Sequence, residues 1–297
     1  MNRVIRKNLA GYAFLLPWLV GFLLLAIGPI LFSLYLSFTK YNVINPPQWI
    51  GLDNYAYMFG RDARFRKALQ VTFTFVAFAV PAKLVFALAV AMLLDKGIRA
   101  IGIYRALFYL PSILGGSIAV AILWRNLFNA DGVVNTILGF VGIDGPAWLA
   151  DPRYSLWTLI VLAVWQFGSP MLIFLAGLRA IPQELYEAAE IDAAGKVKQF
   201  FAITVPLLAP VIFFNLVLQM IEAFKSFSGA FIISGGSGAP LDSLLFYTVY
   251  LFNEAFSFLR MGYASALAWV LLAIIAAFTA IAFWTSKYWV HYEGERG

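Results

Sequence analysis

Six stretches of this 297-residue chain are almost free of charged side chains. They are residues 12–38, 68–94, 106–124, 154–178, 199–221 and 261–286, and together they hold one charged residue, Lys83. Each has at least 19 residues, and about 20 apolar residues cross the hydrocarbon core of a bilayer as a helix. Lipid offers the backbone no hydrogen-bond partners, so each N–H and C=O group must be paired within the segment, and such a segment crosses the bilayer as a helix. The pattern predicts an all-α integral membrane protein with six transmembrane helices.

Composition favours lipid as the solvent of this chain. Charged residues make up 12% and hydrophobic residues 62%, whereas a soluble domain carries roughly 25% charged residues. A soluble fold of this length cannot bury so many apolar side chains, because its surface grows nearly as fast as its volume. A cytosolic enzyme, a disordered chain and a disulfide scaffold are therefore excluded.

The distribution of Lys and Arg predicts the orientation. With the N-terminus in the cytoplasm, the inner segments hold 11 Lys and Arg in 53 residues and the outer segments hold 9 in 97. Positive charge is enriched on the cytoplasmic side of membrane proteins. We therefore expect a multi-pass protein of a bacterial inner membrane with both termini in the cytoplasm. The first apolar run is too long for a cleaved signal sequence, and the basic excess reflects topology rather than nucleic-acid binding.

Metal and catalytic chemistry are not expected on this chain. It has no cysteine and a single histidine, His291, beyond the last predicted span. A thiolate or histidine metal site and a Ser–His catalytic pair within the membrane are thereby excluded. We therefore expect no catalytic residue and no metal site.

The most informative segment is cytoplasmic and connects the fourth and fifth predicted spans. Residues 179–206 read RAIPQELYEAAEIDAAGKVKQFFAITVP. Glu184, Glu187 and Glu190 recur at helical spacing near the positive end of a short helix. Helices that lie on anionic lipid usually carry Lys and Arg on their polar face, so this acidic helix fits better into a groove on a protein partner. A purely structural turn between two spans is the alternative. Pro206 marks the predicted entry into the next span.

This segment resembles the EAA loop of permease subunits in ABC importers. The family pattern is Glu-Ala-Ala, three residues, Gly, nine residues, Ile, one residue and Leu-Pro. Glu187, Ala188 and Ala189 match it, as do Ile203 and Pro206. Ala193 stands at the Gly position and Val205 at the Leu position, and Gly195, two residues on, is an alternative site for the turn.

The resemblance extends over nearly the whole chain and is to carbohydrate-type permeases. It implies a type I ABC importer permease fold, a single transmembrane domain over residues 1–297 and a coupling helix over about 183–195. It also implies a second permease subunit, usually a different chain, two cytoplasmic ATPases, an extracytoplasmic solute-binding protein and a carbohydrate substrate. The residues implied in ATPase coupling are Glu187, Ala188, Ala189, Asp192, Ala193, Gly195 and Pro206. The sequence has no Gly-x4-Gly-Lys-Ser/Thr phosphate loop, so ATP and Mg are expected on the partner ATPases and no cofactor on this chain.

Polar residues inside the spans are the candidates for the transport path. Intramembrane polar groups are costly and usually face a cavity or another helix. The candidates are Lys83 in the second span, Trp165, Gln166 and Ser169 in the fourth, and Asn215, Gln219, Glu222 and Lys225 in and after the fifth. Aromatic, amide and carboxylate groups at helical spacing suit a sugar. Interhelical hydrogen bonding or ion pairing is the alternative for each of them.

Other functions remain as alternatives. An ABC importer for a non-sugar solute fits the same residues. A secondary transporter needs intramembrane ion ligands and often repeated halves, but this chain has one intramembrane Lys and no intramembrane carboxylate. A membrane enzyme needs a clustered polar catalytic set, which the sequence lacks.

Overall fold

The computed structural model describes residues 3–96 and 101–290, and the chain divides into two compact units. One unit is Met1–Asp62 with Leu251–Leu272, and the other is Ala63–Tyr250 with Ala273–Gly297. In the described part, four helices are long and apolar enough to cross a membrane: Phe14–Ser37, Ala63–Asp95, Lys196–Ile233 and Met261–Ser286. Two bent helix pairs raise this number to six if each pair is one span.

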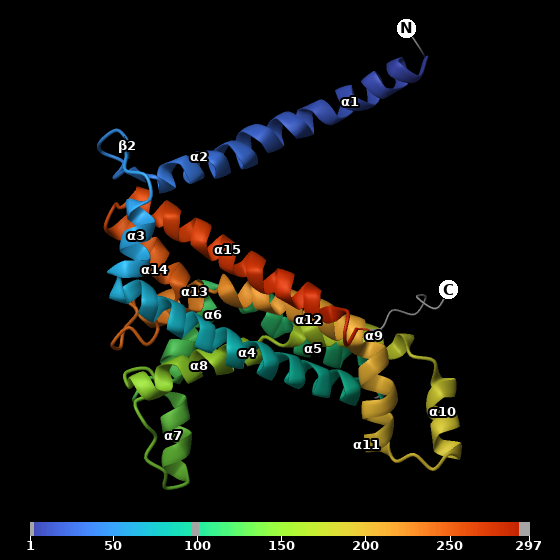
Figure 1. Cartoon of the computed structure of the whole chain (residues 1–297). Coiled ribbons are helices and arrows are strands. Elements are labelled where there is room, and N and C mark those ends of the chain that lie inside the picture. Colours follow the sequence, from blue (N-terminus) through green and yellow to red (C-terminus); the bar gives the residue numbers. More distant parts are fainter. Residues whose placement is uncertain (1–2, 97–100, 291–297) are drawn as a thin grey trace. The chain divides into compact units, whose positions relative to one another are not determined.

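The first unit is built from the first predicted span, the segment that follows it and part of the last predicted span. Its elements are α1 (Arg3–Phe22), η1 (Leu23–Ile27), α2 (Gly28–Ser37), β1 (Thr39–Lys40), β2 (Gln48–Trp49), α3 (Asp53–Gly60), η3 (Asn253–Ser257) and the start of α15 (Met261–Ser286) (Figure 1). The two strands pair antiparallel, with Thr39 opposite Trp49. The Tyr263 hydroxyl donates to the buried Asp62 carboxylate, which ties α15 to the end of α3.

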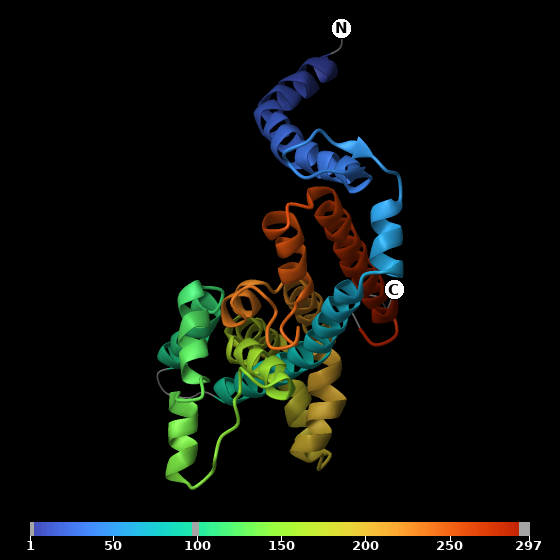
Figure 2. The same ribbon diagram turned by 90° about the vertical axis from the view of Figure 1, so that its left-hand side faces the viewer.

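The second unit is a helical bundle around α4. Its elements are α4 (Ala63–Asp95), α5 (Ile101–Leu114), α6 (Ile118–Leu127), α7 (Val133–Phe140), α8 (Pro152–Trp165), α9 (Gly168–Ala180), α10 (Gln183–Ile191), α11 (Lys196–Gln199), η2 (Phe200–Thr204), α12 (Val205–Phe224), α13 (Ser228–Ile233), α14 (Tyr247–Phe252) and the end of α15. Only the first part of α14 belongs to this unit. Helices α10 and α11 project from one end of the bundle and α7 from the other (Figures 1 and 2).

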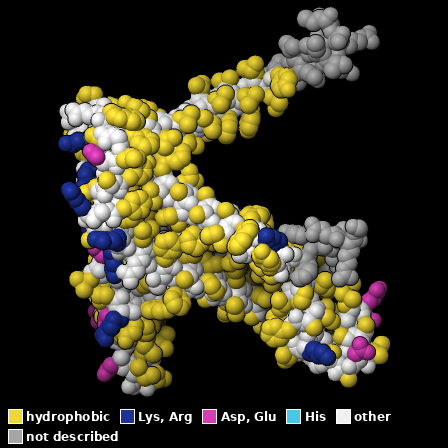
Figure 3. All heavy atoms as spheres, viewed as in Figure 1, with side chains coloured by type: hydrophobic (Ala, Val, Ile, Leu, Met, Phe, Trp, Pro, Cys, Tyr) yellow, Lys and Arg dark blue, Asp and Glu magenta, His cyan; other side chains and the backbone are white. Residues whose placement is uncertain are grey.

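The core of this bundle comes from two helix stripes with matching spacing. On α4 the buried residues are Val80, Leu84, Ala87, Ala91 and Leu94, and on α9 and its N-cap they are Phe167, Met171, Phe174, Leu175 and Leu178. Alternating steps of three and four residues keep each stripe facing its partner, as in knobs-into-holes packing. The small side chains on α4 let α9 approach closely. Hydrophobic side chains cover the long helices, and on the face shown in Figure 3 charged side chains gather at α10 and α11.

Two of the six predicted spans are broken rather than continuous. The third prediction, residues 106–124, falls on α5 and α6, whose axes differ by 97°. Gly115 and Gly116 lie in the break, and the Ser117 hydroxyl caps α6 by accepting from the Val120 N–H at 3.3 Å. The fourth prediction, residues 154–178, falls on α8 and α9, which differ by 43°. Apolar composition predicts a span but does not reveal such a break.

Two π-helical stretches precede prolines. Stretch η1 ends two residues before Pro29, and η2 ends two residues before Pro206. A proline ring clashes with the carbonyl four residues earlier, and that residue lies inside the π-helical stretch in both cases, where the widened turn relieves the clash. Helical structure therefore continues through Pro206 without a break. Helical structure runs from Lys196 to Phe224.

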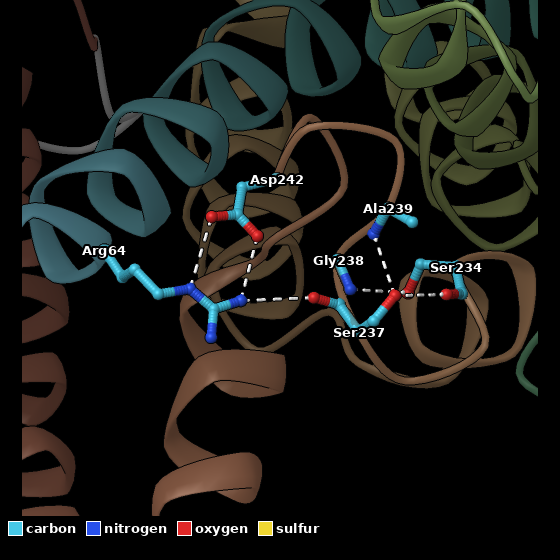
Figure 4. A network of polar contacts seen from close by, with 6 residues as sticks. All are labelled: Arg64, Ser234, Ser237, Gly238, Ala239 and Asp242. Carbon is cyan, nitrogen blue, oxygen red and sulfur yellow. Dashed lines mark hydrogen bonds and ion pairs between the residues drawn. The ribbon is translucent and has the colours of Figure 1, made fainter.

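A charged contact fixes the loop between α13 and α14 to the start of α4. The Arg64 guanidinium donates to both carboxylate oxygens of Asp242, at 3.2 and 2.8 Å, and to the Ser237 carbonyl at 3.2 Å (Figure 4). Within the loop, the Ser234 hydroxyl accepts from the Gly238 N–H at 3.2 Å. The Ser237 hydroxyl accepts from the Ala239 N–H and donates to the Ser234 carbonyl. The Gly- and Ser-rich segment is thus an ordered turn.

Candidate functional site: a membrane cavity and a cytoplasmic helix

A cavity of about 440 Å³ lies in the second unit, between α4, the two helix breaks and the end of α12. Six of the eight residues predicted for the transport path line it: Lys83, Gln166, Ser169, Gln219, Glu222 and Lys225. They lie on α4, at the break between α8 and α9 and at the end of α12. The other walls are mainly apolar or small, including Phe75, Leu159 and Phe246. The cavity thus combines polar groups with apolar walls and has the size of a small-molecule site.

Hydrogen bonds connect the two helix breaks at the wall of this cavity. The Ser112 hydroxyl of α5 donates to the Gln166 carbonyl at 2.9 Å and accepts from the Ser169 N–H at 3.0 Å. The Gln166 amide in turn donates to the Gly115 carbonyl at 3.1 Å. The first N–H groups of a helix have no hydrogen-bond acceptor within that helix. The Ser112 hydroxyl, on the neighbouring helix α5, is the acceptor for the Ser169 N–H near the start of α9. A Cβ at Gly115 would overlap the Gln166 side chain, so this contact requires glycine.

The charged residues of the cavity differ in depth. Lys83 lies in the middle of α4 and is half-buried. Glu222 and Lys225 lie at the end of α12, where their side chains are 69% and 57% exposed and their charged atoms are 3.4 Å apart. The Glu222 carboxylate attracts the Lys83 ammonium, but no ion pair joins them among the described residues. The deep part of the cavity therefore contains an ammonium group and the mouth contains an ion pair.

Two predicted path residues do not line the cavity. Trp165 packs against Trp124, with ring centroids 5.9 Å apart. Asn215 is fully buried in α12, and neither of its amide atoms has a hydrogen-bond partner in the described part of the chain. Ser112 lines the cavity but was missed. A single serine in an apolar run carries no periodic signal, and the neighbouring Gly115–Gly116 pair was the one available sequence cue.

The cytoplasmic helix predicted over about 183–195 is shorter in the structure. Helix α10 ends at Ile191. Ala193 then takes a left-handed conformation, with φ of 56°. Its N–H donates to the Glu190 carbonyl at 3.0 Å, and the Ala194 N–H donates to the Ala189 carbonyl at 2.9 Å. These two bonds form a Schellman motif, which usually has glycine at the left-handed position.

Ala193 itself therefore makes the turn, at the position where the family pattern has glycine. Gly195, the alternative site for this turn, has φ of −64° and precedes α11 in an extended conformation. Its backbone needs no glycine. The helix ends because the chain reverses at Ala193, which helical periodicity alone does not reveal.

Side-chain contacts hold α10 against the start of the fifth span. The Tyr186 and Thr204 hydroxyls are 2.8 Å apart, and the Gln199 amide donates to the Ala194 carbonyl at 3.0 Å. The Lys196 ammonium pairs with the Glu190 carboxylate. The hydrogen bond from Lys196, and then its charge, lower the pKa of Glu190. These contacts join α10 and the turn after it to α11 and η2.

The residues predicted for ATPase coupling lie on and beside α10. Glu187 and Ala188 are exposed on the helix, Ala189 is half-buried, and Asp192, Ala193 and Gly195 are exposed in the turn that follows. Pro206 lies apart from them, half-buried near the start of α12. Leu185 and Ile191 are 41% and 87% exposed. The helix thus presents carboxylates and apolar side chains to its surroundings. His291 lies outside the described residues.

Known proteins are similar to this chain over nearly its whole length. Residues 55–289 match the family described as binding-protein-dependent transport system inner membrane component. The chain is 55% identical over 296 residues to the probable ABC transporter permease protein YesP of Bacillus subtilis (strain 168), covering 99% of this chain and 96% of that protein. It is 30% identical to the lactose transport system permease protein LacF of Rhizobium radiobacter, covering 93% of this chain and 94% of that protein.

A solved structure shares the fold. It is the crystal structure of a bacterial ABC transporter involved in the import of the acidic polysaccharide alginate, with a TM-score of 0.81 and 22% sequence identity. The match covers 96% of this chain and 97% of that chain.

Proposed function

Because the chain belongs to the family of binding-protein-dependent transport system inner membrane components, we propose that it forms part of the path by which an ATP-driven importer takes up a sugar or oligosaccharide. The observation that carries this proposal is the cavity, which brings together six of the predicted polar side chains from α4, the α8–α9 break and the end of α12. The amides of Gln166 and Gln219 and the hydroxyl of Ser169 suit sugar hydroxyls. The apolar walls suit the apolar faces of sugar rings. The names of similar proteins, which include a lactose and a trehalose/maltose transport system permease, support a carbohydrate substrate.

The whole chain acts as one transmembrane domain that carries no catalytic residue, no metal and no cofactor of its own. ATP and Mg bind to two cytoplasmic ATPase subunits. A second permease subunit, a different chain, completes the path, and an extracytoplasmic solute-binding protein delivers the substrate. Both termini lie in the cytoplasm, as does α10. Supporting this topology, α10 and α7 project from opposite ends of the bundle, and Asp95 at the end of α4 is 3.4 Å from Arg179 at the end of α9.

Helix α10 is the coupling helix in this proposal. It docks in a groove of an ATPase subunit through Glu187 and the small surface of Ala188 and Ala189. The Schellman turn from Asp192 to Gly195 shapes the end of the docking surface. Closure of the ATPases pulls on α10, and the Tyr186–Thr204 contact passes this movement to α12, which also lines the cavity. Pro206 follows Thr204 by two residues, directly after the π-helical stretch η2, in which the helical turn is wider than in an α-helix.

Charge reversal at Glu187 tests this proposal. We expect Glu187→Lys to reduce the amount of ATPase subunit that co-purifies with the chain and to abolish ATP-dependent uptake in proteoliposomes. Asp144→Lys makes the same charge reversal at another exposed residue and controls for expression and folding by leaving ATPase co-purification unchanged. A Glu187→Lys complex that assembles and transports normally would refute the role of α10.

A further inference from the structure

Lys83 is placed where a charged group is costly. It lies in the middle of the 33-residue helix α4, between the buried core residues Val80 and Leu84. A charged side chain inside a membrane span faces a cavity or a partner and usually marks a pathway. Lys83 faces the cavity, together with Gln166 and Gln219. Among the described residues its ammonium group has neither an ion pair nor a hydrogen bond.

The charges around the cavity do not balance. Glu222 is the one carboxylate among the residues that line it, and this carboxylate pairs with Lys225 at 3.4 Å. Both side chains of this pair are more than half exposed, so solvent screens their charges. Glu222 attracts Lys83 without contacting it. The cavity therefore carries one positive charge in excess, and it lies at the deep position.

We infer that the substrate of this cavity is a saccharide with a monoanionic group, such as a uronic acid unit, whose carboxylate pairs with the Lys83 ammonium. The inference rests on the proposed function and specifies its substrate class. The single excess charge matches one carboxylate better than a phosphate monoester, which carries about −1.5 to −2 at neutral pH. The amides of Gln166 and Gln219 bond to the hydroxyls of the same saccharide. A neutral saccharide would leave the ammonium without a counter-charge.

This inference is tested by measuring how saccharide probes bind to the importer assembled in nanodiscs. The solute-binding protein is left out, so its own selectivity does not affect the result. The two probes are a disaccharide with one uronic acid unit and its carboxyl-reduced, neutral counterpart, and Kd is measured by saturation-transfer NMR. We expect the wild-type complex to bind the acidic probe at least about tenfold more tightly, as for a charge-assisted hydrogen bond. Lys83→Met should weaken binding of the acidic probe much more than binding of the neutral probe, so that the preference is lost, and Lys83→Arg should restore the preference in part. Lys67→Met removes a charge from α4 outside the cavity and should change neither value.

Three results would overturn the inference: equal binding of the two probes by the wild-type complex, binding of neither probe, or an equal loss of both in Lys83→Met. These results are distinct from failure of the proposed function. ATP-dependent uptake of neutral sugars by both the wild-type and Lys83→Met complexes would refute the acidic substrate alone. Normal assembly and uptake with Glu187→Lys would refute the coupling mechanism alone.

Discussion

Replacing Ala193 with glycine should stabilise the end of α10. Ala193 holds φ of 56° in the Schellman motif, a left-handed conformation that costs a non-glycine residue about 1–2 kcal/mol. Glycine removes this cost but loses more backbone entropy on folding, worth about 0.5–1 kcal/mol. The net gain is about 0.5–1 kcal/mol, because the exposed methyl group of Ala193 contributes little packing.

Backbone hydrogen exchange of the assembled complex measures this gain directly. The Ala193 and Ala194 amides donate the two bonds of the motif, so their exchange reports its opening. A gain of about 0.5–1 kcal/mol slows exchange about two- to fivefold in Ala193→Gly. Ala194→Gly, at a residue without positive φ, should speed exchange instead. Faster exchange in Ala193→Gly than in the wild type would show that Ala193 is not strained and would refute this reasoning.

Two further predictions concern the cavity wall and the coupling segment. Ser112→Ala removes the acceptor of the Ser169 N–H and should destabilise the complex by about 1–2 kcal/mol in denaturant unfolding. By contrast, Ser286→Ala, whose hydroxyl bonds within its own helix, should change stability by less than about 0.5 kcal/mol. Lys196 lowers the pKa of Glu190, so their ion pair stabilises the end of α10. This stabilisation is complete when the pH is above the ordinary pKa of a glutamate, and it is lost as the pH falls through the lowered pKa of Glu190. Exchange protection there should fall with acidification in the wild type but show no such step in Lys196→Met, and an identical step in both would exclude the pair as its cause.

Charge patterning predicted the positions of the spans because a bilayer excludes charge wherever a helix crosses it. The fold class is confirmed by the family match and the shared fold. The break at Gly115 and Gly116 was not predicted, because both halves of a broken span are equally apolar. Its angle depends on the Ser117 cap and on the Gln166 side chain that packs against Gly115. The Ser117 cap is local, whereas Gln166 lies 51 positions beyond Gly115 in the sequence.

The break between α8 and α9 explains why Trp165 does not line the cavity. Helical spacing places Trp165, Gln166 and Ser169 on neighbouring positions of one continuous helix. Helix α8 ends at Trp165 and α9 begins at Gly168, so the phase of the first helix does not carry over to the second. Gln166 and Ser169 therefore face the cavity while Trp165 packs against Trp124. Ser112 could be identified only once α5 was seen beside this break.

Thiol labelling across the cavity tests most directly whether it is the transport path. The chain has no native cysteine, so a single introduced cysteine can be followed. Gln219 lines the cavity, whereas its neighbour Leu218 on α12 does not and is 38% exposed. We predict that a membrane-impermeant thiol reagent labels Gln219→Cys and blocks ATP-dependent uptake, that bound substrate slows this labelling, and that Leu218→Cys keeps its uptake. Undiminished uptake after complete labelling of Gln219→Cys would contradict the assignment of this cavity to transport.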